Sequence, residues 1–242
     1  MSPRVAESMQ WTDVGILGGG IVGSALACAL ASQPSTAHLS VTLLDGSDLS
    51  LERHSLPDQT FSNRVVSLTP SSQAFLQSVG IWNHLDAGRV FPYSQMTVWD
   101  GASGSGSLIF NASTLEGVPE SIESLGCIVE NVNLHLACLK RLKELGSVEV
   151  KDKVAVDEIA RDSQSSWPIL SSQTFDEPLG TSLLVGADGG MSKVRDFAKI
   201  ASLGWDYQQK GLVATLKIPQ EVENRTAYQR FLPTGPIAFL PV

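Results

Sequence analysis

The 242-residue sequence predicts an α/β fold, a mixed architecture in which a βαβ core carries an inserted antiparallel sheet. Two turns and one group of strands predict it. A glycine-rich turn follows a short apolar segment near the N-terminus, and a second strand-to-helix turn occurs far downstream. The segments with strand character between and after these turns are too many for the core alone, so they predict the inserted sheet.

The first βαβ unit is predicted near the N-terminus. Residues 14–17 form an apolar run typical of a buried parallel strand, and residues 21–32 are rich in Ala and Leu, as expected of a helix. Residues 39–44 form a second apolar strand that ends at Asp45. The uncharged stretch 14–31 has the minimum length of a transmembrane helix, but its five glycines favour a strand, a turn and a helix.

The rest of the chain predicts further helices and strands. A helix is predicted at 70–78 with Thr69 as its N-cap, another from 131 to about 145, and a third at 192–201. Strands are predicted at residues 96–99, 107–110, 148–159, 169–175, 182–185, 212–218, 227–231 and 237–240.

The composition limits the classes of partner and compartment. The chain has 17 basic and 25 acidic residues, a formal net charge of −8, which argues against nucleic acid as a partner. Cys28, Cys127 and Cys138 lack metal-ligand spacing, and three cysteines cannot all pair within one chain. We therefore expect three reduced, mostly buried thiols, as in a cytosolic or mitochondrial matrix protein.

The segment from Gly18 to Gly23 matches the pattern G-x-G-x-x-G, with a predicted strand before it and a helix after it. Gly18 allows the tight turn, Gly20 leaves no side chain between the backbone and a pyrophosphate, and Gly23 lets the helix approach the strand. The helix N-terminus offers free N–H groups and a positive dipole end to phosphates. The motif therefore predicts a Rossmann-like dinucleotide site.

Asp45 closes the second strand, about 20 residues beyond the glycine motif. A carboxylate at this place can accept hydrogen bonds from both ribose hydroxyls of an adenosine, and it would repel a 2′-phosphate. A direct NADP site is therefore disfavoured. The motif alone leaves both FAD and NAD as possible ligands.

The second turn distinguishes the two. Residues 183–189 read Leu-Leu-Val-Gly-Ala-Asp-Gly, followed by Ser192, Val194 and Arg195. This pattern resembles the flavin-dependent monooxygenases of the para-hydroxybenzoate hydroxylase type, in which a strand leads into G-A-D-G and then a helix beginning S-x-V-R. The resemblance implies an FAD-binding α/β core and places Gly186, Asp188 and Gly189 at a turn near the flavin pyrophosphate.

The resemblance implies two more cofactor residues. Arg64 stands where these hydroxylases carry an arginine close to FAD, and a guanidinium can clamp a phosphate at two points. Asn131 stands near a helix start that faces the flavin in the family. For Asn131, a role as helix cap and a role as ligand are equally favoured by the sequence.

Several longer segments resemble the ubiquinone-biosynthesis branch of these hydroxylases, especially its eukaryotic mitochondrial member. They are residues 62–65, 126–131, 204–207 and 228–238. The last is the most specific, since in the family it belongs to the sheet that forms the substrate cavity. The resemblance covers nearly the whole chain from Asp13 onwards.

The resemblance implies an enzyme that hydroxylates the aromatic ring of a polyprenylated phenol or benzoate through a C4a-hydroperoxyflavin. It also implies a ferredoxin system or reduced nicotinamide as electron donor, other ubiquinone-biosynthesis proteins as partners, and peripheral contact with the matrix side of the mitochondrial inner membrane. His38, His54, His84 and His135 are scattered along the sequence, and each is expected to be a surface or structural residue. No catalytic residue and no metal ligand is assigned.

The segment boundaries follow from the same resemblance. Residues 11–94 and 113–203 are expected to form two parts of the FAD-binding domain, with a substrate-domain hairpin at 95–112 between them. Residues 204–242 are expected to begin the substrate-binding sheet.

Two departures from the family pattern leave a second reading open. The sequence has no stretch like the family's Gly-Asp-Ala-Ala-His fingerprint, which follows the substrate sheet, and no mitochondrial presequence. The alternative is therefore a truncated, non-catalytic form that binds FAD in part, through its adenosine half, or only binds partners. A plain NAD-dependent dehydrogenase is disfavoured by the G-A-D-G turn.

Overall fold

A computed structural model describes residues 8–56, 60–101, 106–114, 124–218 and 224–242. The chain divides into two compact units. Unit 1 comprises Met1–Ser55, Val79–His84 and His135–Lys210, and unit 2 comprises Leu56–Ser78, Leu85–Leu134 and Gly211–Val242. The segment boundaries expected from the resemblance stay a prediction.

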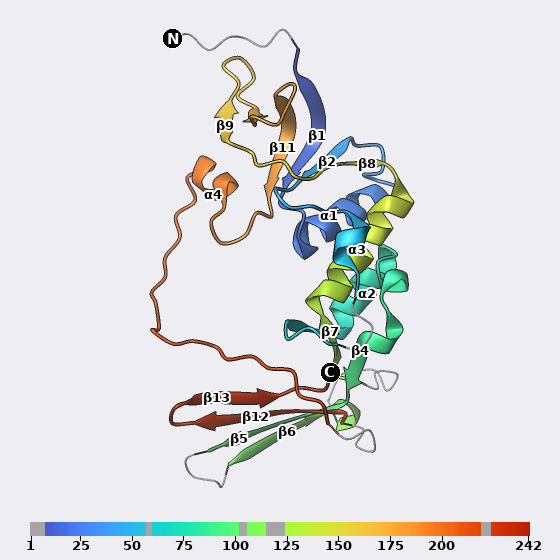
Figure 1. Cartoon of the computed structure of the whole chain (residues 1–242), viewed down its shortest axis with the longest axis vertical. Coiled ribbons are helices and arrows are strands. Elements are labelled where there is room, and N and C mark those ends of the chain that lie inside the picture. The colour runs from blue at the N-terminus through green and yellow to red at the C-terminus, as the bar shows by residue number, and fades with distance from the viewer. Residues whose placement is uncertain (1–7, 57–59, 102–105, 115–123, 219–223) are drawn as a thin grey trace. The chain divides into compact units, whose positions relative to one another are not determined.

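Unit 1 is built on a six-stranded sheet with the strand order β8-β2-β1-β11-β10-β9. Its strands are β1 (Gln10–Leu17), β2 (Val41–Leu44), β8 (Val148–Lys151), β9 (Glu158–Arg161), β10 (Pro168–Ser171) and β11 (Leu179–Gly186). The strands β8, β2, β1 and β11 run parallel, while β10 and β9 are antiparallel additions. Figure 1 shows β1 beside β11 in this sheet.

The helices begin close to their predicted residues, and the first three also end close to them. They are α1 (Ile21–Ser32), α2 (Pro70–Ser78), α3 (Asn131–Leu145) and α4 (Lys193–Phe197), with 3₁₀ turns at Leu51–His54, Trp82–His84, Ala87–Arg89 and Ala112–Thr114. The backbone N–H of Ser72 donates to Oγ1 of Thr69, which confirms the predicted cap of α2. Together β1, α1 and β2 form the predicted βαβ unit, whose length is typical of such units.

The core of unit 1 lies under the central strands. Ile16 on β1 and Leu43 on β2 are fully buried. A cluster of buried side chains that pack together contains Leu17, Leu44, Val156, Leu170 and Leu179. Strands buried on both faces explain why β1 and β2 read as continuous apolar runs in the sequence.

Unit 2 contains two small sheets. One has the order β3-β7-β4 and is antiparallel, and the other has the order β13-β12-β5-β6. Their strands are β3 (Val65–Leu68), β4 (Val90–Tyr93), β5 (Gln95–Asp100), β6 (Ser107–Asn111), β7 (Gly126–Glu130), β12 (Thr226–Leu232) and β13 (Gly235–Phe239). The antiparallel β5–β6 and β12–β13 pairs agree with the strands predicted there, whereas β12 joins β5 in parallel.

Four predicted segments were wrong in extent or kind. Residues 148–159 form two strands instead of one, because Lys153 between them has a φ of 57° and breaks the extended backbone. The strand predicted at 169–175 ends at Ser171, where a turn follows. The helix predicted at 192–201 ends at Phe197, just before Lys199 with a φ of 56°.

The predicted strand at 212–218 is absent. The segment has no regular structure, and Leu212 and Leu216 are exposed. A strand needs partners for its N–H and C=O groups, and within the described part of the chain none of the strands pairs with this segment. This strand was predicted from its apolar residues alone, and apolar residues do not provide a hydrogen-bond partner for the backbone.

The three thiols agree with the sequence prediction. Cys28, Cys127 and Cys138 are free and buried. Burial raises the pKa of Cys28 and Cys138 to about 12 and that of Cys127 to about 11.

Among the residues described, every helix is too short or too polar to cross a lipid bilayer.

Candidate functional site

The two predicted turns lie next to each other in unit 1. The strands β1 and β11 are parallel neighbours, and Leu17 pairs with Gly186 in their register. The N–H of Ala187 donates to the carbonyl of Leu17 over 2.7 Å, so the chain leaves both strands at the same edge of the sheet. This edge is the carboxyl end of the parallel strands, where α/β sheets bind ligands.

Gly18 and Gly23 are required by close packing between the turns. Gly18 has a φ of +108°, and a Cβ on it would stand 2.2 Å from the carbonyl oxygen of Ala187. A Cβ on Gly23 would stand 1.9 Å from the carbonyl oxygen of Gly18. Both geometries match the roles that the motif predicts for its first and third glycines.

Gly20 differs, because it faces open space. A Cβ there would meet nothing within 4 Å, and its φ of −66° is accessible to any residue. Gly20 is the N-cap of α1, a helix of 12 residues whose first turn has no acidic side chain. The backbone at Gly20 and the positive end of α1 are therefore open to an anion.

Asp45 stands at the end of β2 and contacts the glycine turn directly. Its Oδ2 accepts a 2.6 Å hydrogen bond from the N–H of Gly19, and its Oδ1 accepts one of 2.6 Å from the N–H of Ser47. The sequence motif treats Gly19 as a variable position. In the structure a Cβ on Gly19 would approach Cδ1 of Leu49 to 2.6 Å and Cβ of Asp45 to 3.0 Å, so a larger residue here would require the Leu49 side chain to shift.

Asp188 organises the second turn. Its Oδ1 accepts a hydrogen bond from the hydroxyl of Ser192 at 2.5 Å, and its Oδ2 accepts one from the N–H of Lys193 at 2.7 Å. Gly189 has a φ of +80°, and a Cβ on Gly186 would stand 2.8 Å from Cβ of Val194. The hydrogen bonds of the Asp188 carboxylate are thus local ones that hold the start of α4.

A cavity of about 260 Å³ opens between the two turns and the β8–β9 connection. It is lined by Leu17, Gly18, Leu44, Asp45, Gly46, Val154, Ala155, Val156, Asp188, Met191 and Lys193. Lys193 Nζ donates to the carbonyl of Val156 across it. Both acidic residues predicted from the sequence, Asp45 and Asp188, therefore line one cavity.

Within the described ranges, His, Cys, Asp and Glu nowhere gather into a group suited to a metal ion.

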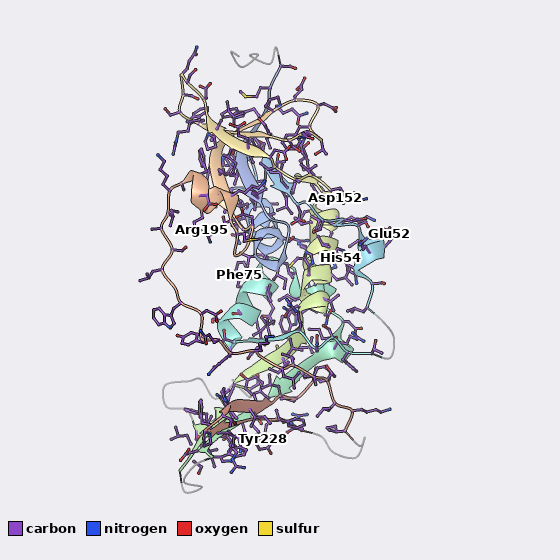
Figure 2. All side chains as sticks on the ribbon, turned by 60° about the vertical axis from the view of Figure 1, so that its left-hand side comes forward. Glu52, His54, Phe75, Asp152, Arg195 and Tyr228 are labelled. Atoms are coloured by element: carbon purple, nitrogen blue, oxygen red, sulfur yellow. The ribbon has the colours of Figure 1, made fainter. Side chains whose placement is uncertain are left out.

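His135 on α3 is a residue of this site that the sequence analysis missed. Its Nε2 lies 2.7 Å from the carbonyl oxygen of Gly19. Burial lowers its pKa below the usual value, with the ring of His54 acting in the same direction and the Gly19 hydrogen bond and Asp45 opposing it. Although the four histidines are scattered in sequence, the rings of His54 and His135 meet edge to face at 4.9 Å. Figure 2 labels His54 beside α3.

The two remaining predicted residues lie in unit 2. The N–H of Asn131 donates to the carbonyl of Arg64 over 3.0 Å where β3 pairs with β7, while the Arg64 side chain is exposed. Oδ1 of Asn131 is buried and has no hydrogen-bond partner among the described residues. It therefore does not act as a helix cap here.

A buried ion pair fixes the loop that leads to Arg64. Nη1 of Arg89 donates to Oε2 of Glu130 at 2.8 Å, with side chains 7% and 0% exposed. Nη2 of Arg89 donates to the carbonyl of Thr60 at 2.7 Å, and the N–H of Ser62 donates to Oε1 of Glu130. The guanidinium also stacks over the ring of Phe61 at 4.6 Å. No feature of the sequence pattern singles out this pair.

Unit 2 has a larger, mostly apolar cavity of about 500 Å³. It is lined by Ser62, Asn63, Val65, Phe91, Leu212, Val213, Ala214, Thr215, Leu216, Ile218, Asn224, Ile237, Ala238, Phe239, Leu240, Pro241 and Val242. The 228–238 segment, which carries the most specific resemblance, contributes Ile237 and Ala238 to it.

Comparisons with known proteins agree with this architecture. A protein-family scan finds no matching model. The chain is 40% identical over 241 residues to the mitochondrial ubiquinone biosynthesis monooxygenase COQ6 of Xenopus tropicalis, with 95% of this chain and 49% of that protein covered. The COQ6 proteins of Homo sapiens and Saccharomyces cerevisiae are 36% and 34% identical, each with 48% of its length covered. The chain thus spans about half the length of these curated relatives.

Solved structures show the same fold. PqsL of Pseudomonas aeruginosa, described as a probable FAD-dependent monooxygenase, superposes with a TM-score of 0.62 at 18% identity, covering 82% of this chain and 48% of PqsL. The p-nitrophenol 4-monooxygenase PnpA of Pseudomonas putida gives 0.57 at 20% identity, covering 77% and 43%. The sequence and the fold agree: over about 95% of its length the chain is similar to the COQ6 ubiquinone biosynthesis monooxygenases, and it spans about half of their length.

Proposed function

We propose that unit 1 binds the adenosine diphosphate half of FAD, and that the chain is part of a flavin-dependent monooxygenase. This monooxygenase would hydroxylate the aromatic ring of a polyprenylated intermediate in ubiquinone biosynthesis. The observation that carries the proposal is the meeting of two glycine turns at the ends of β1 and β11. The names of the relatives supply the reaction class.

The residues of the first turn fit a dinucleotide. Gly20 leaves open the space that a diphosphate needs, and the N-terminus of α1 supplies N–H groups and a favourable dipole. Each carboxylate oxygen of Asp45 accepts one backbone hydrogen bond and keeps a second acceptor site for a ribose hydroxyl. The cavity beside Asp45 is the proposed place of the adenosine, and Asp188 of the second turn also lines it. Gly186 and Gly189, which flank Asp188 in that turn, are proposed as further cofactor-binding residues.

Arg64 and Asn131 are the proposed ligands in unit 2. The Arg64 side chain is exposed and holds its charge, as contact with a phosphate requires. The unpartnered Oδ1 of Asn131 is a buried acceptor, and a buried polar atom calls for a donor. FAD carries N–H and O–H donors that could fill this place.

FAD, when bound, supplies the activation of oxygen, because an aromatic ring does not react with ground-state oxygen at a useful rate without a cofactor. The protein residues must then hold the ring and exclude water. The apolar cavity of unit 2 has a volume in the range of small-molecule sites, and we propose that it receives the apolar part of the substrate.

The further partners and the location rest on the relatives. Because these proteins are named mitochondrial, we propose a mitochondrial location for this chain as well. The long apolar tail of a polyprenylated substrate favours peripheral contact with the matrix side of the inner membrane and with other proteins of the same pathway. The electron donor would be a ferredoxin system or reduced nicotinamide.

A binding experiment tests the proposal. The purified chain is mixed with FAD and desalted, its visible spectrum is recorded, and ADP is titrated calorimetrically. We expect bound flavin that ADP displaces. Asp45→Asn should weaken ADP binding by roughly 10- to 100-fold, the effect of losing hydrogen bonds to a charged acceptor.

The matched control is Asp176→Asn. Asp176 is exposed in the loop before β11, at the opposite end of that strand from the turn. The Asp176→Asn variant should bind FAD and ADP with the affinities of the wild-type chain. A wild-type chain that binds neither FAD nor ADP, or an Asp45→Asn variant that binds as tightly as wild type, would contradict the proposal.

A further inference from the structure

The carbonyl group of Gly19 is held by side chains from two helices. His135 on α3 donates to it from Nε2 at 2.7 Å, and Ser24 on α1 donates from its hydroxyl at 2.8 Å. On the other side of the same residue, the N–H of Gly19 donates to Asp45. Both peptide groups of Gly19 are therefore fixed by side chains, at the centre of the glycine turn.

This arrangement sets the direction of the next N–H group. A peptide group is planar and trans, so the N–H of Gly20 must point opposite to the carbonyl of Gly19. Since that carbonyl points to His135 and Ser24, the N–H of Gly20 points away from both side chains. Gly20 is exposed and borders open space.

We propose that His135 is a positioning residue for the proposed dinucleotide site. It holds the Gly19 carbonyl so that the Gly19–Gly20 peptide presents its N–H to the ligand's diphosphate. The inference rests on the proposed binding of FAD, and it adds a residue outside the glycine motif and far from it in sequence.

The hydrogen bond also determines the form of the imidazole. A carbonyl oxygen only accepts, so Nε2 of His135 carries the proton and Nδ1 of the neutral ring does not. The His54 ring meets this imidazole edge to face, with 4.9 Å between centroids. Asp45 is the charged side chain near it on the β2 side.

Three variants separate the donor from its surroundings. His135→Leu removes the N–H, His135→Gln keeps an N–H donor on a side chain of similar reach, and His84→Gln makes the same change at another histidine of unit 1. His84 contacts Glu144 at 2.8 Å and takes no part in the glycine turn. ADP and FAD affinities are measured by calorimetry, and the thermal unfolding midpoint checks folding.

We expect His135→Leu to weaken ADP binding roughly 3- to 10-fold, the effect of one hydrogen bond. His135→Gln should stay within about twofold of wild type, and His84→Gln should match it. If His135→Leu does not fold, Ser24→Ala removes the other donor to the same carbonyl and should weaken ADP binding to a similar extent.

Nitrogen-15 spectra of the histidine rings in the wild-type chain provide a readout that a merely space-filling residue would not give. They should show His135 protonated at Nε2 and unprotonated at Nδ1. The opposite tautomer, a His135→Leu variant with wild-type affinity, or a His135→Gln variant as weak as His135→Leu would overturn the inference. Failure of the wild-type chain to bind ADP would instead remove the proposed function itself, while the spectra would still report on the hydrogen bond.

Discussion

The carbonyl of Leu17 accepts a hydrogen bond from the N–H of Ala187, and this hydrogen bond joins the two turns of the candidate site. It continues the parallel pairing of β1 and β11 by one residue beyond the strands. The position of Ala187 in turn explains the need for glycine at position 18, because the next peptide group, between Ala187 and Asp188, occupies the space that a side chain there would take.

The first prediction separates folding from ligand binding within the glycine turn. Gly18→Ala should lower the free energy of unfolding by more than about 2 kcal/mol, because of the positive φ and the contact with Ala187. Gly20→Ala should change it by less than about 1 kcal/mol, yet reduce ADP affinity roughly tenfold or more, since its methyl group enters the phosphate space. Urea unfolding and calorimetric titration measure the two quantities. Equal effects of both substitutions on stability would contradict this assignment.

The second prediction concerns the buried pair in unit 2. Glu130→Gln should destabilise the protein by about 3–5 kcal/mol, because it removes one of the two charges of a buried ion pair. Urea unfolding measures the loss. The matched control is Glu149→Gln, which alters a carboxylate that is 56% exposed and pairs with Lys151, and no measurable change is expected there. A Glu130→Gln variant as stable as this control would show that the pair does not hold the loop.

The third prediction is a dependence of stability on pH. Burial lowers the pKa of His135, with His54 acting in the same direction. The unfolded chain therefore binds a proton at this residue more readily than the folded chain. Stability should fall as the pH drops through the ordinary histidine pKa of about 6.5, and should be fully present above it.

His135→Gln removes this titrating group. The difference in unfolding free energy between pH 7.5 and pH 5.5, measured by urea unfolding, should therefore be smaller in the variant than in the wild type. The aspartates and the glutamate with lowered pKa values titrate below this window and affect both proteins alike. An identical pH dependence in the two proteins would be inconsistent with a buried, neutral His135.

The fourth prediction is that the thiols do not react in the folded protein. Cys28, Cys127 and Cys138 are buried, and burial keeps their pKa values far above neutrality. Because the thiolate is the reactive form, iodoacetamide at pH 7.5 should modify none of them within the time that it modifies a free thiol. In urea all three should react, as mass spectrometry would show. Fast labelling of the native chain would indicate local opening at the labelled residue.

The sequence was most informative where a local pattern determines a local structure. The bounds of α1 follow from a segment rich in Ala and Leu that ends shortly before Pro34, and the start of α2 follows from the Thr69 cap and a proline at the first helical position. The meeting of residues 18–23 with residues 186–189 was also predictable, because a strand before each turn and a helix after it place both at the same edge of a parallel sheet.

Other features depend on contacts that no local pattern specifies. The short strands β3, β4 and β7 were not predicted, although β7 is an apolar run that is buried throughout. Residues 212–218 are just as apolar and form no strand. His135 lies four residues into α3, where its sequence neighbours give no sign of the glycine turn that it touches. Tertiary pairing decides each of these cases.

The central place of β1 in its sheet has a consequence for biosynthesis. The N–H of Gly15 donates to the hydroxyl of Thr181, a residue 166 positions further along the chain. While the ribosome is still making the intervening segments, one edge of β1 has no neighbour, and such open edges invite association with other chains. A nascent chain that has not yet exposed residues 179–186 should therefore depend on chaperones and be unable to retain a nucleotide.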